Sequence, residues 1–292
     1  MKITTGKRIA PRRIMLYGQH GIGKSTWAAS APQAIFLNIE DGIADVDCAQ
    51  TEHLKSYGDV VAALSWLLTE QHSFRTVVID TVDWLEQLIH RDIASAAGVV
   101  SVADIDFGKG FPRAIPKWRY ILENLDALRS HRRMNVILLS HARVEKFSNP
   151  DGATYDRYAP DLWTNSRGEG VGNMIQEWCD EVLFAQFVVF TKKEGKGFNE
   201  KAVAIGGKDR VIKTCESASS LAKNRIGLPE EMPMDWSVYE SYVKAAYAAR
   251  TAKPSPEPAG NIAGLVTDGS SKQPAPVSEE AAALVSDFAE RF

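Results

Sequence analysis

The sequence predicts an α/β fold in which helices cover both faces of a twisted, mostly parallel β-sheet. Three segments, 34–39, 76–80 and 135–140, are apolar at nearly every position, which is typical of strands buried on both faces. Segments with helical periodicity lie between them. Because parallel strands need long crossover connections, this alternation indicates strand–helix–strand units rather than hairpins.

The remaining elements follow along the chain. A first short strand is expected at 14–17, and helices are expected at 60–68, 82–96, 118–129 and 236–249. Segments 181–190, 202–205 and 210–214 predict an antiparallel meander late in the core, with a Gly/Lys turn at 192–197. The polar segment 143–172 predicts a loop that separates the parallel strands from the meander.

The composition excludes several classes of protein. With 45% hydrophobic and 24% charged residues, the chain is neither wholly disordered nor fibrous. The three cysteines are far apart, which excludes a disulfide framework or a zinc ribbon and fits a reducing cytoplasm. No apolar stretch approaches the length of a membrane span, and the first residues lack the apolar run of a signal peptide. We therefore expect a cytoplasmic protein without a membrane segment.

The distribution of charge and proline predicts four parts of the chain. Residues 1–13 form a basic arm suited to DNA or a neighbouring subunit, and residues 14–250 form the globular domain. Residues 251–278 have the Pro/Ala-rich composition of a disordered linker. Residues 279–292 are acidic and apolar, which suits either a helix docking on a protein partner or a plain disordered end.

The segment GQHGIGKS, Gly18 to Ser25, matches the P-loop pattern G-x-x-x-x-G-K-[ST] between a predicted strand and a predicted helix. Glycines let the chain turn tightly, so that backbone N–H groups at a helix start converge on phosphate oxygens. Lys24 adds a positive charge for the β- and γ-phosphates, and the Ser25 hydroxyl is a Mg²⁺ ligand. The expected nucleotide-binding residues are Gly18, Gln19, His20, Gly21, Ile22, Gly23, Lys24, Ser25 and Thr26. No guanine-reading N/T-K-x-D stretch is evident in the core, which favours ATP over GTP.

Asp80 is the candidate for the second Mg²⁺ ligand. It ends a buried strand, and carboxylates at the carboxyl ends of parallel strands face the ligand site. The alternative is an ordinary aspartate that caps the helix beginning at Val82, a role for which Asp83 is the better candidate.

Glu40 and His141 also end predicted strands and are candidates for action on the γ-phosphate. Glu40 stands in Ile-Glu-Asp-Gly, a context that resembles the catalytic glutamate of RecA-like ATPases. Asp41 competes for this role, and plain turn chemistry is a third option. His141 resembles the γ-phosphate sensor of the same proteins, and a structural histidine is the alternative.

The stretch Lys223-Asn-Arg225-Ile-Gly227 resembles the K-x-R-x-G element of the RecA/DnaB/KaiC group, whose Lys and Arg enter the ATP site of the neighbouring subunit. A positive fork supplied in trans would neutralise charge on the transferred phosphoryl group. The resemblance thus implies a homo-oligomer, ring or filament, with shared ATP sites and with Lys223 and Arg225 as catalytic residues. The alternative is the C-terminal end of a helix, where the helix dipole favours the two cations and Gly227 forms the cap.

Together these motifs resemble a phage-encoded group of RecA-like P-loop ATP-binding proteins, which includes single-strand annealing and recombination ATPases. The resemblance spans about residues 10–245 and includes the segments 106–110 and 177–183. It implies a RecA-like ATPase core at 14–250 and, for a phage protein, the cytoplasm of a bacterial host.

The resemblance also implies a contact with single-stranded DNA, because mobile loops after the sensor strand bind DNA in RecA-like recombinases. The matching segment 143–172 combines cations with aromatic rings, the chemistry of sequence-neutral single-strand binding. A surface lid or subunit contact is the alternative, favoured by interleaved acidic residues. The candidate DNA-binding residues are Arg143, Lys146, Arg157, Arg167 and, secondarily, Lys109.

The leading hypothesis is therefore a Mg²⁺-dependent ATPase that acts on single-stranded DNA in recombination or strand annealing. The alternatives are a helicase-like motor or loader, and a nucleotide-gated interaction protein with weak hydrolysis.

Overall fold

The computed structural model describes residues 10–149, 152–165, 169–194 and 201–251, which build one nine-stranded sheet around the P-loop strand. The strands are β1 (Arg13–Gly18), β2 (Ala34–Asn38), β3 (Ala49–Gln50), β4 (Thr76–Asp80), β5 (Asn135–Phe147), β6 (Tyr155–Pro160), β7 (Glu181–Glu194), β8 (Lys201–Lys213) and β9 (Glu231–Pro233). Their order is β3-β2-β4-β5-β1-β7-β8-β9, and β6 pairs with β5 outside this path. All pairs from β3 to β7 are parallel, whereas β6, β8 and β9 are antiparallel to their partners. The expected mostly parallel sheet with late antiparallel strands is confirmed.

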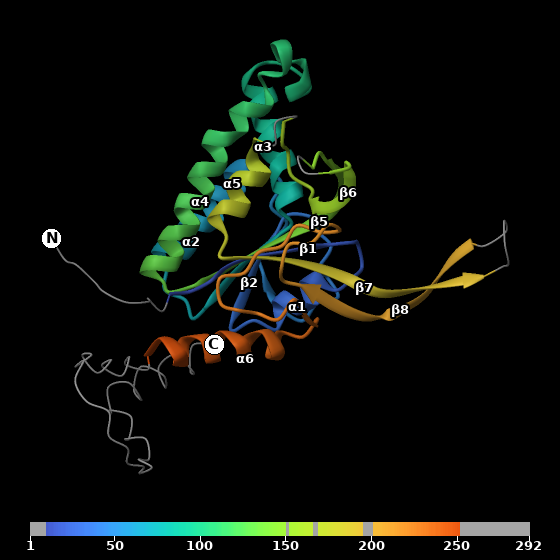
Figure 1. The fold of residues 1–292 in the computed structure, drawn as a ribbon. Helices are drawn as coiled ribbons and strands as arrows, with labels where there is room; N and C mark the ends of the chain where they lie inside the picture. Colours follow the sequence, from blue (N-terminus) through green and yellow to red (C-terminus); the bar gives the residue numbers. More distant parts are fainter. Residues whose placement is uncertain (1–9, 150–151, 166–168, 195–200, 252–292) are drawn as a thin grey trace, which may run out of the picture.

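Helices cover both faces of this sheet, as predicted (Figure 1). The helices are α1 (Lys24–Ala29), α2 (Tyr57–Thr69), α3 (Val82–Ala96), α4 (Ala114–His131), α5 (Val171–Trp178) and α6 (Trp236–Thr251). Side chains alternate along a strand, so that Met15 and Tyr17 pack in the core under α2 to α5, while Ile14 and Leu16 pack in the core with α1 and α6. None of the described helices has the length and apolar character needed to cross a bilayer.

The last two cations of the predicted basic arm are part of the sheet. Arg12 forms a buried ion pair with Glu181, the first residue of β7. Arg13 begins β1 and lies 3.1 Å from the Asp180 carboxylate. These two arginines therefore join β1 to β7 at the amino edge of the strands, and residues 1–9 lie outside the described part of the chain.

The segment 143–172 is not the loop that its polarity predicts. β5 continues to Phe147 and pairs with β6, and α5 begins at Val171. Opposite charges such as Glu145 and Arg157 face each other across the two strands, a pairing that stabilises an antiparallel ribbon. A ribbon with no fully buried face shows no apolar periodicity, which is why the sequence pattern indicates a loop here.

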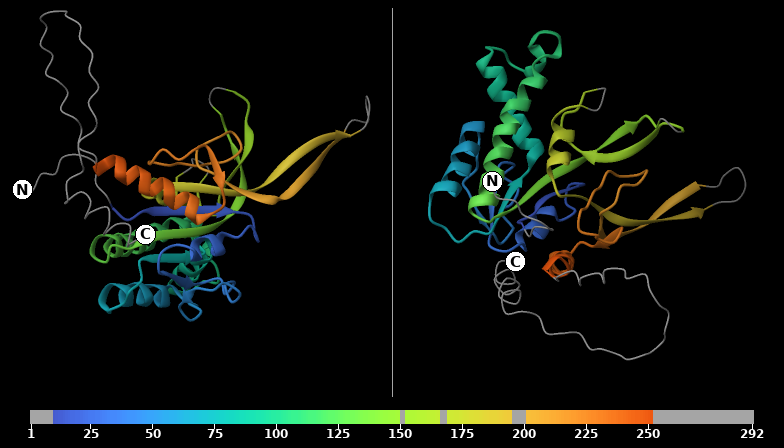
Figure 2. Two further views of the ribbon diagram at one scale, coloured as in Figure 1. Left: turned by 90° about the horizontal axis from the view of Figure 1, so that it is seen from below. Right: turned by 60° about the vertical axis from the view of Figure 1, so that its left-hand side comes forward.

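The strands β7 and β8 form a longer hairpin than predicted. The two segments expected at 202–205 and 210–214 form one strand, and β7 runs through the start of the expected turn to Glu194. Positions 195–200 lie outside the described residues. Figures 1 and 2 show that this hairpin extends well past the body of the sheet.

Candidate functional site

The P-loop joins β1 to α1 at the carboxyl edge of the parallel strands. Gly18 ends β1 between His141 of β5 and Ala185 of β7, and a Cβ here would clash with the Ala185 carbonyl oxygen. Gly23 precedes α1 with a φ of 100°, in the left-handed region that favours glycine. The loop opens into a cavity of about 310 Å³ that it lines together with Glu40, Asp80 and other strand-end residues.

Lys24 lines this cavity, and its ammonium bonds to the loop itself. Its Nζ donates to the carbonyl oxygens of Gly18 and Gln19, at 3.1 and 3.0 Å. Burial lowers the pKa of Lys24, although three carboxylates nearby oppose this effect. Among the other loop residues, His20 and Thr26 line the cavity, whereas the Ile22 side chain is buried in the core.

Ser25 and Asp80 form a direct contact beside Lys24. The Ser25 hydroxyl donates to Asp80 Oδ2 across 2.7 Å, and Asp80 is only 5% exposed. Burial, together with the Glu40 carboxylate, raises the pKa of Asp80 to about 6 even though Ser25 and Lys24 oppose the shift. A hydroxyl and a carboxylate oxygen are hard donors of the kind Mg²⁺ takes. The pair therefore fits a magnesium ion.

Glu40 and Asp41 point in different directions. The Thr81 hydroxyl donates to Glu40 Oε2 across 3.2 Å, which fixes this carboxylate on the cavity wall. Asp41 has a φ of 63°, and its carboxylate lies 3.7 Å from His53 with 64% of the side chain exposed. Of the two carboxylates, Glu40 lines the cavity and Asp41 does not.

His141 lies on the cavity wall, and Asp83 holds its ring. Asp83 accepts from the His141 backbone N–H across 2.9 Å, and its second oxygen lies 2.7 Å from Nδ1. Although burial opposes the charge, the Asp83 carboxylate raises the pKa of His141. The prediction that Asp83 caps α3 is wrong, because β5 brings His141 against the first turn of this helix and the carboxylate is used there.

Two residues that support the cavity wall and the P-loop could not be identified from the sequence. The Thr81 hydroxyl orients Glu40, as described above, and Arg210 of β8 donates from Nη1 to the Ile22 carbonyl across 3.1 Å. The sequence places Arg210 at the start of a strand but carries no signal that this strand reaches the P-loop. Its position depends on the long-range pairing of β7 with β8.

Lys223 and Arg225 lie at the amino edge of the sheet, away from the P-loop of their own chain. Arg225 Nη1 is 3.3 Å from Asp180, which also binds Arg13 at the start of β1. The six residues of β1 put about 16 Å between this point and the P-loop. Lys223 Nζ donates to carbonyl oxygens in the last turn of α5, at Gln176 and Glu177. The helix dipole favours a positive charge at this end of a helix. No helix is present at 223–227, so the expected alternative of a helix end at Gly227 does not apply.

Three of the five candidate DNA-binding residues, Arg143, Lys146 and Arg157, lie in the β5–β6 ribbon rather than in a loop. Arg143 and Arg157 both pair with Glu145, at 3.3 and 3.0 Å, and the Arg157 guanidinium lies 4.2 Å from the centre of the Phe147 ring. Lys146 is exposed. A hollow of about 660 Å³ lies between this ribbon and α5. Arg167 lies outside the described residues, and Lys109 is exposed in a turn remote in sequence from the ribbon.

Comparison with known proteins gives one family match. A family model described as an AAA domain matches residues 10–226, a range that includes every candidate residue from the P-loop to Arg225. No curated protein matches the sequence. A solved structure described as "Crystal structure of the RadB recombinase" is similar with a TM-score of 0.41 and 13% identity, over 76% of this chain and 85% of that chain.

The raised pKa of Asp80 predicts that its charge destabilises the nucleotide-free protein. The folded state holds the Asp80 proton more tightly than the unfolded chain, so the free energy of unfolding falls as pH rises from about 4 to about 6. Asp80→Asn should therefore raise the free energy of unfolding by up to about 3 kcal/mol near pH 8 and by little near pH 4. Urea unfolding at both pH values measures this.

The control for this measurement is Asp45→Asn, which removes an exposed carboxylate from the loop after β2. It should show no comparable pH-dependent gain. Equal gains for both variants, or a gain for Asp80→Asn only at low pH, would contradict the destabilising role of the buried charge.

Proposed function

The chain belongs to the AAA domain family, and from this premise we propose that it is a Mg²⁺-dependent ATPase acting on single-stranded DNA in recombination or strand annealing. The observation that carries the proposal is the contact of Ser25 with Asp80 beside the Lys24 ammonium. The same cavity wall holds Glu40 and His141. A phosphate cradle, a pair suited to a metal ion and two polar groups thus face one partly enclosed space.

Five residues that line the cavity have direct roles in the proposed reaction. Lys24 exchanges its bonds to the loop carbonyls for the β- and γ-phosphates. Ser25 and Asp80 would hold Mg²⁺, which neutralises charge on the phosphate oxygens when bound. Glu40, held by the Thr81 hydroxyl, orients water and accepts its proton. His141, held by Asp83, donates a hydrogen bond to the γ-phosphate.

The position of Arg225 supports a shared ATP site. The residue is half-exposed, with 52% of its side chain accessible, and lies at the edge of the sheet opposite to the P-loop. It can therefore reach a P-loop only in another subunit. We include in the proposal a ring or filament in which Arg225, and Lys223 once released from α5, neutralise the transferred phosphoryl group of a neighbour.

The β5–β6 ribbon is the proposed site for single-stranded DNA. Its hollow is lined by Arg143, Lys146, Arg157 and Phe147, and the Arg157 guanidinium lies against the Phe147 ring, which suits phosphates next to unstacked bases. Glu145 neutralises part of this charge, so DNA must compete with it for the two arginines. Lys146 is exposed and makes the sharper experimental target.

The division of the chain completes the proposal. Residues 14–250 would act as the ATPase domain, 251–278 as a flexible linker, and 279–292 as a docking segment for a protein partner. The acidic and apolar composition of the last segment supports this assignment.

Variants of the cavity should separate nucleotide binding from turnover. Lys24→Ala should abolish ATP binding because the phosphates lose their cation. Glu40→Gln should retain binding and lower turnover by about 10²–10⁴-fold. Calorimetry with ATP and Mg²⁺ measures binding, and phosphate release measures turnover. Asp41→Asn is the matched control, expected to stay within about twofold of the wild type because this exposed carboxylate does not line the cavity. A larger loss in Asp41→Asn than in Glu40→Gln would reverse the assignment.

Mixing experiments should reveal a site shared between subunits. Arg225→Ala should spare ATP binding and lower turnover by about 10³-fold or more. Mixed with Lys24→Ala, it should regain part of the activity, because some assemblies then combine an intact P-loop with an intact Arg225. The control mixture is Lys24→Ala with Glu40→Gln. Lys24 and Glu40 both line the cavity that a single chain contributes to each site. Every chain in this mixture therefore has a damaged cavity, and no intact site can form. Rescue in both mixtures, or in neither, would argue against a site completed in trans.

Single-stranded DNA should stimulate ATP turnover and bind at the ribbon. Lys146→Ala should weaken DNA binding at all sequences and reduce the slope of log affinity against log salt by about 0.7. Fluorescence anisotropy over a salt series measures both effects. Lys244→Ala, on α6, is the matched control and should leave the slope unchanged. Turnover that DNA does not change, with no difference between these variants, would favour a nucleotide-gated interaction protein.

A further inference from the structure

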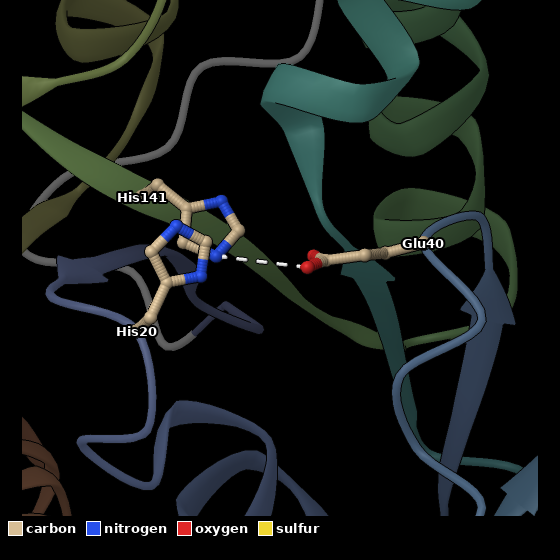
Figure 3. Close-up of side chains that lie close together, drawn as sticks. All are labelled: His20, Glu40 and His141. Atoms are coloured by element: carbon tan, nitrogen blue, oxygen red, sulfur yellow. Dashed lines mark ion pairs between the residues drawn. The ribbon is translucent and has the colours of Figure 1, made fainter.

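Three side chains from three different elements converge at the rim of the P-loop cavity. His20 comes from the loop, Glu40 follows β2, and His141 lies in β5. Each offers one ligand atom, and these atoms all lie within 4.8 Å of one another. Figure 3 shows the two imidazole rings against each other and the Glu40 carboxylate directed toward them. The His20 and His141 ring centres are 3.7 Å apart.

The histidine of β5 is already oriented as a metal ligand. Asp83 lies 2.7 Å from Nδ1, which leaves Nε2 facing Glu40 Oε1 at 3.8 Å. A carboxylate on the far nitrogen is the usual outer partner of a metal-bound histidine, because it fixes the tautomer and strengthens the ligand. The Asp83 side chain is 9% exposed, so this support is held inside the fold.

The charge around the cavity favours a divalent cation. Three carboxylates, Glu40, Asp80 and Asp83, surround the single ammonium of Lys24. These carboxylates outnumber the Lys24 ammonium and the Arg210 guanidinium, which bonds to the loop at Ile22, in a partly enclosed space where charges interact more strongly than in water. One divalent ion at the rim compensates this excess.

The donor set distinguishes this cluster from the magnesium pair. Two imidazole nitrogens and one carboxylate are a ligand set of Zn²⁺ sites that keep a fourth position open, whereas Mg²⁺ prefers oxygen donors. Tetrahedral zinc needs ligand atoms about 3.4 Å apart. The cluster must therefore contract by no more than about 1.4 Å from its widest separation of 4.8 Å. His20 is exposed on the loop and supplies this movement.

We propose that the nucleotide-free protein binds one Zn²⁺ ion through His20, Glu40 and His141, with the fourth position open to the cavity. This site is separate from the magnesium pair of Ser25 and Asp80. A consequence that rests on the proposed function is inhibition: a zinc ion held there takes Glu40 and His141 away from water and the γ-phosphate, so turnover falls.

The test is a titration of the full-length, untagged protein with Zn²⁺ and with Co²⁺ in the absence of nucleotide. Calorimetry should give one Zn²⁺ per chain, and bound Co²⁺ should show tetrahedral visible absorption without thiolate charge-transfer bands. His20→Ala should weaken zinc binding by about tenfold or more, and Asp83→Asn by about 10–100-fold. The matched control is His53→Ala, which removes another histidine beside a carboxylate, outside the cluster. The affinity of His53→Ala for Zn²⁺ should stay within about twofold of that of the wild type.

Lys24→Ala separates this proposal from the proposed function. It removes the competing positive charge and the nucleotide site, so it should retain zinc binding or strengthen it while ATP binding is lost. Thiolate bands from Co²⁺, unchanged affinity in His20→Ala, or equal losses in His20→Ala and His53→Ala would each overturn the zinc site. Thermal unfolding of every variant checks that the fold is retained. Because His20 is exposed, its replacement should not disturb core packing.

Discussion

A buried carboxylate at the edge of the sheet is the constraint on which the rest of the site depends. Removing Asp80 from water costs free energy unless cations or donors approach it. The Ser25 hydroxyl and the Lys24 ammonium offset only part of this cost, because the pKa of Asp80 stays raised at about 6. The fold therefore keeps a negative charge where a metal–triphosphate complex would compensate it. Binding of such a ligand stabilises the native state, and the empty site lowers its stability.

The strand order turns this local constraint into a site. Because β5 lies between β1 and β4, the register sets Gly18 level with His141 and Asp80 level with Leu139. The P-loop, the acid of β4 and the histidine of β5 thus reach the same edge although they lie far apart in sequence. Helix α3 follows β4 directly, so its first turn brings Asp83 to His141.

This geometry also shows what could be predicted from the sequence. Continuous apolar runs predict the central strands, and the P-loop pattern with polar residues at strand ends predicts which groups share one edge. The partner of His141 could not be predicted, because it depends on how the first turn of α3 packs against β5. Arg210 depends on the register of a hairpin, and β3 and β9 contain only two and three residues. The β5–β6 ribbon is missed because a ribbon solvated on both sides has no apolar period.

The extension of β5 links the cavity to the β5–β6 ribbon through one continuous strand. His141 faces the cavity, and Arg143, two residues further along the same strand, belongs to the β5–β6 ribbon. Side chains two apart in a strand lie on one face, so His141 and Arg143 lie on the same face of β5. If a ligand on the ribbon changes the affinity for nucleotide, nucleotide must change the affinity for that ligand by the same factor. If nucleotide affinity is the same with and without a ligand on the ribbon, β5 transmits no coupling between the two sites.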